Sequence, residues 1–88
     1  MNIKMYTLIN IIIYINMQNV PQVNVLTNFK SLEVCEDKFH ENLDRIKDSN
    51  KKGSIKTDQD KKKYLEIVDN ANNLKSYWFC NEIIFYRK

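Results

Sequence analysis

Hydrophobic residues alternate along the N-terminal part of the chain. One parity holds Met5, Ile9, Ile11, Ile13, Ile15 and Met17, and the other holds Tyr6, Leu8, Asn10, Ile12, Tyr14 and Asn16. A period of two in residues rich in β-branched and aromatic side chains predicts a strand with one face fully buried and the other partly buried. We place this strand near residues 5–17, after a disordered lead-in at residues 1–4. Pro21 then marks a break, and residues 23–29 form a second extended segment.

From Ser31 the hydrophobic spacing changes to that of an α-helix. Leu32, Cys35, Phe39, Leu43 and Ile46 recur at intervals of three or four residues, which places them on one stripe. Ser31 is the expected N-cap, and the helix should run to about Asp48, where polar residues and Gly53 end it. The outer face of this helix is acidic and carries Glu33, Glu36, Asp37, Glu41, Asp44 and Asp48.

Residues 57–74 are compatible with two interpretations. Thr57 followed by Asp60 resembles a helix start, whereas residues 64–68 have the composition of a strand. The Asn- and Asp-rich segment 69–73 favours a hairpin connection, because these residues tolerate left-handed backbone conformations. We therefore predict strands near 62–68 and over 75–86. The expected fold is α+β, a small antiparallel sheet of three to four strands with one amphipathic helix packed on one face.

The length and the glycine content restrict the class of protein. A chain of 88 residues forms one small domain, here taken as residues 1–88, with a single marginal core. The single glycine excludes P-loops and dinucleotide folds, which need two or three glycines at fixed spacing. We therefore expect no nucleotide-binding enzyme of those classes.

The net charge of +3 comes from one lysine-rich stretch. We interpret residues 49–61 as a loop, and the lysines in and next to it are Lys51, Lys52, Lys56, Lys61, Lys62 and Lys63. No arginine or aromatic residue interrupts them. A solvated loop is the favoured interpretation, and weak, salt-sensitive binding of nucleic acid through residues 51–63 is the alternative.

An apolar run at residues 8–15 raises the question of membrane insertion or export. The run is far shorter than the roughly 20 residues that a transmembrane helix needs, so we expect no transmembrane span. Residues 8–30 contain no Ala, Gly or Ser, which a signal-peptide cleavage site would use. The sequence therefore favours a cytoplasmic location over an exported one.

The two cysteines occupy positions that can meet. Cys35 lies on the apolar stripe of the helix, and Cys80 lies in the middle of the last strand. A disulfide between Cys35 and Cys80 follows if the helix packs on that face of the sheet. Two reduced, buried thiols in a cytosolic protein are the alternative, and the sequence leaves both interpretations open.

Two short segments carry a resemblance to other proteins. Residues 28–35 (Asn-Phe-Lys-Ser-Leu-Glu-Val-Cys) and 77–80 (Tyr-Trp-Phe-Cys) resemble a pattern in short uncharacterised proteins of marine phages and AT-rich bacteria. The resemblance covers about residues 23–82, and its motif is loose. It implies the same order of strand, helix and Cys-bearing final strand. No known activity comes with the resemblance. A phage-encoded modulator of a host protein is the kind of role that it suggests.

Catalytic chemistry has few candidates in this chain. His40 is the only histidine, and it shares a helix with Glu36, Asp37, Glu41 and Asp44. One exposed helix face provides no closed set of ligands, so we predict no metal and no cofactor. Cys35 and His40 lie about 140° apart around the helix and form no nucleophile and base pair. We expect a protein that is not an enzyme.

The last strand carries apolar residues on both parities. Trp78, Ile84 and Tyr86 share one parity with Cys80, and Tyr77, Phe79, Ile83 and Phe85 share the other. One helix covers only one face of a sheet, so we predict that Tyr77, Phe79, Ile83 and Phe85 bind a partner, either another protein or a second copy of the chain. In the alternative, the isoleucine-rich N-terminal strand folds over them.

These observations give three hypotheses for the function. The first is a non-enzymatic protein-interaction module that binds through its aromatic sheet face. The second is an exported or envelope-associated structural domain held by the disulfide, and the third is a weak nucleic-acid binder.

Overall fold

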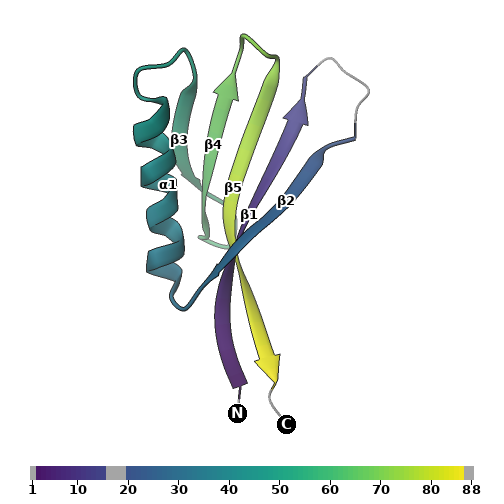
Figure 1. Ribbon diagram of the computed structural model, residues 1–88, viewed down its shortest axis with the longest axis vertical. Coiled ribbons are helices and arrows are strands. Elements are labelled where there is room, and N and C mark those ends of the chain that lie inside the picture. The colour runs from purple at the N-terminus through teal and green to yellow at the C-terminus, as the bar shows by residue number, and fades with distance from the viewer. Residues whose placement is uncertain (1, 16–19, 87–88) are drawn as a thin grey trace.

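The described part of the chain folds into one α-helix and a five-stranded antiparallel sheet (Figure 1). The computed structural model describes residues 2–15 and 20–86, apart from the side chains of Asn2, Phe85 and Tyr86. The elements are β1 (Asn2–Tyr14), β2 (Gln22–Phe29), α1 (Leu32–Ile46), β3 (Lys52–Thr57), β4 (Lys63–Asp69) and β5 (Leu74–Tyr86). The strand order is β2-β1-β5-β4-β3. The predicted α+β class is confirmed, but the sheet has five strands instead of three to four.

The two long strands β1 and β5 form the centre of the sheet. They pair without interruption from Asn2↔Tyr86 to Tyr14↔Leu74, and together they extend beyond the other elements (Figure 1). The prediction of a disordered segment at 1–4 is wrong for residues 2–4, because each finds a partner in β5. Lys4 Nζ also lies 3.4 Å from Glu82 Oε1 across this ribbon. Asn16 and Met17, the end of the predicted strand, lie outside the described residues.

The additional strand lies in the segment that we predicted as a lysine-rich loop. Residues 52–57 form β3, which pairs with β4 from Lys52↔Val68 to Thr57↔Lys63. Ile55 packs against the core. Gly53 permits the close approach of α1, since a Cβ atom here would lie 2.5 Å from Leu43 Cδ2. One apolar residue and one glycine facing the helix are enough to attach a strand that is otherwise polar.

The segment with two interpretations is a strand followed by a turn. Residues 63–69 form β4, so the helix alternative is wrong and the predicted strand at 62–68 is confirmed within one residue. Asn73 has a φ of 53°, the left-handed conformation expected of the Asn-rich connection. The Asp69 side chain stabilises this turn by accepting hydrogen bonds from the backbone N–H and the side chain of Asn72.

Helix α1 packs on one side of the sheet and contacts all five strands. The Ser31 Oγ accepts a hydrogen bond from the backbone N–H of Val34, which confirms Ser31 as the N-cap. The helix ends at Ile46, two residues before the predicted end. Its apolar stripe builds the core, in which the buried hydrophobic residues are Leu8, Cys35, Phe39, Leu65 and Ile67.

A disulfide joins the helix to the central strand. The sulfur atoms of Cys35 and Cys80 lie 2.12 Å apart, and their Cα atoms are 6.2 Å apart. The predicted pairing is therefore confirmed, and the alternative of two reduced thiols does not describe this structure. Because Cys35 is fully buried, the cross-link fixes the first turn of α1 directly onto β5.

Candidate interaction surface

The sheet has a second face, opposite α1, that no other element of the described structure covers. We call it the open face. Cys80 bonds to the helix, so the alternation of side chains along β5 places Tyr77, Phe79 and Ile83 on the opposite side. Cross-strand partners share a face, which assigns the neighbouring residues of the other strands to the same surface.

Two rows of apolar side chains cross the middle of the open face. In the first row Val23 of β2, Ile11 of β1 and Tyr77 of β5 are successive partners. The second row runs from Val25 through Ile9 and Phe79 to Tyr64 of β4. The rings of Tyr64 and Tyr77 contact each other with centroids 6.3 Å apart. The β1 and β5 members are partly buried by their neighbours alone, since no second layer lies over them.

Three of the predicted partner-binding residues, Tyr77, Phe79 and Ile83, lie on this face, but they do not form one cluster. Tyr77 and Phe79 belong to the two central rows. Ile83 is separated from them by a polar row of Asn28, Thr7 and Asn81, in which Thr7 Oγ1 lies 2.6 Å from Asn28 Oδ1. The backbone of Phe85 pairs with Ile3, while its side chain lies outside the described residues. Strand β1 lies beside β5 in the same sheet, so the alternative in which it folds over the face is wrong.

The most exposed apolar side chains lie in a segment that the sequence did not predict as a binding surface. Val20, Val23, Val25 and Leu26 are 84%, 59%, 68% and 49% exposed, more than any other large hydrophobic residue that the structure describes. They lie on or just before β2, which is an edge strand of the sheet. In the sequence, only the alternation of Val23 and Val25 within a short extended segment could have indicated this apolar surface.

The opposite edge of the open face is charged. Lys56 Nζ lies 2.8 Å from Glu66 Oε1. The hydrogen bond from Lys56 holds the pKa of Glu66 below its usual value, and hydrogen bonding with Tyr77 acts in the same direction. Burial raises the pKa of the Tyr77 hydroxyl. Glu66 is therefore ionised at neutral pH, and this corner of the face carries a fixed ion pair.

The lysine-rich stretch is partly neutralised by acidic neighbours. Besides the pair between Lys56 and Glu66, Lys51 Nζ lies 4.0 Å from Asp69 Oδ2. Lysines paired in this way release fewer counterions from a nucleic acid. The arrangement favours a structural role for these two lysines over nucleic-acid binding.

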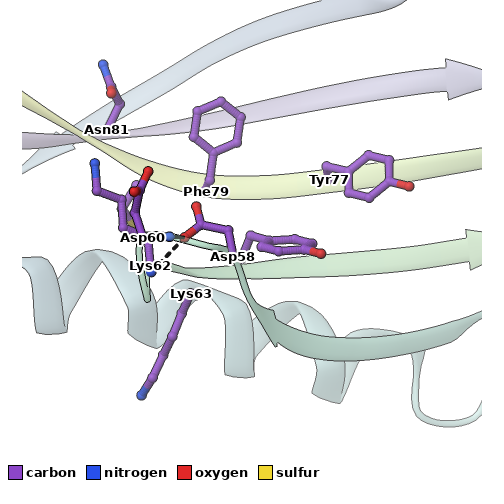
Figure 2. A pocket seen from close by; sticks show the side chains of 9 residues that line it. Asp58, Asp60, Lys62, Lys63, Tyr77, Phe79 and Asn81 are labelled. Atoms are coloured by element: carbon purple, nitrogen blue, oxygen red, sulfur yellow. Dashed lines mark hydrogen bonds between the residues drawn. The ribbon is translucent and has the colours of Figure 1, made fainter.

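A shallow pocket of about 440 Å³ opens where β5 passes the β3–β4 turn (Figure 2). Tyr77 and Phe79 line it from β5, and Asp58, Asp60 and Lys62 line it from the turn. Asp58 holds the turn by accepting hydrogen bonds from the backbone N–H groups of Asp60 and Lys62. The pocket combines aromatic walls with a charged rim, and it is continuous with the central rows through Tyr77 and Phe79.

The residues considered for catalysis show no convergent arrangement. His40 is exposed on α1. Within the described residues, no group of three or more His, Cys, Asp or Glu side chains is placed to hold a metal ion. No helix in the described part of the chain has the length and apolar character needed to cross a membrane.

Comparisons of the chain with protein-family models, with curated proteins and with solved structures gave no match. The resemblance to short phage and bacterial proteins therefore stays a prediction. The class that the structure defines is a small α+β domain with a disulfide between its helix and its sheet.

Proposed function

We propose that this chain is a non-enzymatic interaction module that binds another protein, or a second copy of itself, through the open face. The observation that carries the proposal is the pair of central rows, in which Tyr77 and Phe79 continue through Ile9 and Ile11 to the exposed valines of β2. Antiparallel sheets with one uncovered face normally alternate apolar with polar residues, and contiguous apolar surface marks a binding site.

The composition of the rows supports a protein partner. Tyrosine and phenylalanine present large, rigid contact areas and are enriched in interface cores. The rows themselves carry no charged residue on β2 or β1, and the charged residues lie toward β3 and β4. A central apolar area beside a polar and charged rim is the usual anatomy of an interface. A phage-encoded modulator of a host protein would be one such module.

The proposal is tested by replacing Phe79 with glutamate in tagged protein captured from native lysate. We expect Phe79→Glu to reduce recovery of a specific partner, or of an untagged second copy, by about tenfold or more, because a charge at the centre of an apolar interface is left desolvated. Val34→Glu on the exposed side of α1 is the control and should retain binding. Circular dichroism verifies that both variants fold. Recovery that is equal for wild type and Phe79→Glu would exclude the open face as the binding surface.

A second candidate is favoured by the disulfide between Cys35 and Cys80. We infer from it an exported or envelope-associated structural domain, since disulfides persist in oxidising compartments. In protein isolated from its native compartment, we expect alkylation to modify both cysteines only after reduction, as measured by intact mass. Two thiols that react without reductant would eliminate this candidate.

A further inference from the structure

The two edges of the sheet differ in their protection against pairing with another strand. Edge strand β3 carries Lys52 and Lys56, and lysines on an edge oppose the addition of a further strand. Edge strand β2 has the sequence Gln-Val-Asn-Val-Leu-Thr-Asn-Phe, with no charged residue and no proline. Strand β2 therefore lacks the side-chain protection that β3 has.

The backbone of β2 is regular where its apolar side chains are exposed. Residues 22–25 pair in register with β1, from Ile12↔Gln22 to Ile9↔Val25. The register shifts between Thr7 and Ile9, so that two residues of β2 lie opposite Leu8. A bulge of this kind discourages edge pairing. It lies beyond Val25, however, and leaves the four preceding residues with alternate N–H and C=O groups directed away from β1.

We propose that β2 binds the β2 strand of a second copy of this chain, antiparallel and centred on Asn24. This inference rests on the proposed function and names its partner. The sequence Val23-Asn24-Val25 is symmetric about Asn24. Two-fold pairing places each Val23 opposite a Val25 of the other copy on the open face, and each Asn24 opposite its equivalent on the helix face.

The charges on the two edge strands permit self-pairing of β2 and oppose self-pairing of β3. A two-fold operation brings each strand against its own sequence in reverse order, so charges of one sign on the strand come close to the same charges of the other copy. Strand β2 has no charge to repel, whereas the same operation on β3 would set Lys52 opposite Lys56 of the other copy. Among the large hydrophobic residues that the structure describes, only Val20 is more exposed than Val23 and Val25, and pairing covers these two valines.

The pairing would merge the two open faces. A two-fold axis perpendicular to the sheet keeps both helices on one side and joins the central rows of each copy through Val23 and Val25. The result is a continuous sheet of twice five strands, with Phe79 of each copy on the same apolar surface. Dimerisation through β2 would in this way build a larger binding face from two halves.

The test is the effect of a lysine on the edge, measured by sedimentation velocity over a range of concentrations. We expect wild type to dimerise and Val25→Lys to weaken dimerisation by about tenfold or more. Val34→Lys is the matched control, because Val34 is 48% exposed on α1, and it should dimerise like wild type. Wild type that stays monomeric at its highest soluble concentration overturns the proposal, as does Val25→Lys that dimerises normally.

The register is tested by cysteine cross-linking. In the proposed register Asn24→Cys forms an intermolecular disulfide under mild oxidation, because residue 24 faces its equivalent at a Cα separation of about 5 Å. Gln22→Cys does not, since residue 22 faces residue 26. The native cysteines are already paired with each other. Equal cross-linking of the two variants contradicts the register. If Phe79→Glu abolishes self-association and Val25→Lys does not, the proposed function survives and this inference fails.

Discussion

Replacing Phe39 with alanine is expected to lower the free energy of unfolding by about 3–5 kcal/mol. The ring is 1% exposed and belongs to the core cluster, in which it contacts residues of both the helix and the sheet. Its removal leaves a cavity that a core of only five buried hydrophobic residues, among those the structure describes, cannot fill by rearrangement. Urea denaturation followed by circular dichroism measures the change.

Leu32→Ala provides the control for this prediction. Leu32 starts the same helix but is 42% exposed, so its truncation should cost less than about 1 kcal/mol. Equal losses for Phe39→Ala and Leu32→Ala would mean that α1 is not packed on the sheet as described. Because so small a domain has a net stability of only about 5–10 kcal/mol, Phe39→Ala should also unfold at a much lower temperature.

Removal of the disulfide is expected to cost about 3–4 kcal/mol of the free energy of unfolding. Cys35 and Cys80 are separated by 45 residues, and closing a loop of this length restricts the unfolded chain strongly. The measurement compares urea denaturation of the oxidised protein with that of the protein in excess reductant.

A double variant, Cys35→Ala with Cys80→Ala, separates the cross-link from other effects of reductant. Its stability should equal that of the reduced protein to within about 1 kcal/mol and should not change when reductant is added. A wild type whose unfolding midpoint is the same with and without reductant would falsify the stabilising role of the cross-link.

The sequence predicted the elements in which residue type and spacing indicate the local structure directly. The spacing of Cys35, Phe39 and Leu43 specified the buried stripe of α1, and Ser31 specified its start. The asparagines at 70–73 distinguished a turn from a helix. Strand β3 could not be predicted in this way, because Gly53 and Ile55 face the helix but Lys52 and Lys56 on either side of them give the segment the composition of a polar loop.

The candidate site was only partly predictable. Apolar residues on both parities of β5 identified Tyr77 and Phe79, since a single helix can cover one parity only. The contribution of Val23 and Val25 depends on the strand order, which joins β2 to β5 through β1. Pairing between strands distant in the sequence has no local signal, and the high exposure of the valines follows from the position of β2 at the edge.

The strand order also has a consequence for the time course of folding. Strand β5 lies between β1 and β4, although it follows both of them in the sequence. On the ribosome, β1 with β2 and β3 with β4 can form two separate hairpins, but the seam between them stays open until residues 74–86 have left the exit tunnel. Insertion of this segment between the two hairpins requires contacts between residues that are distant in the sequence, which makes folding slow.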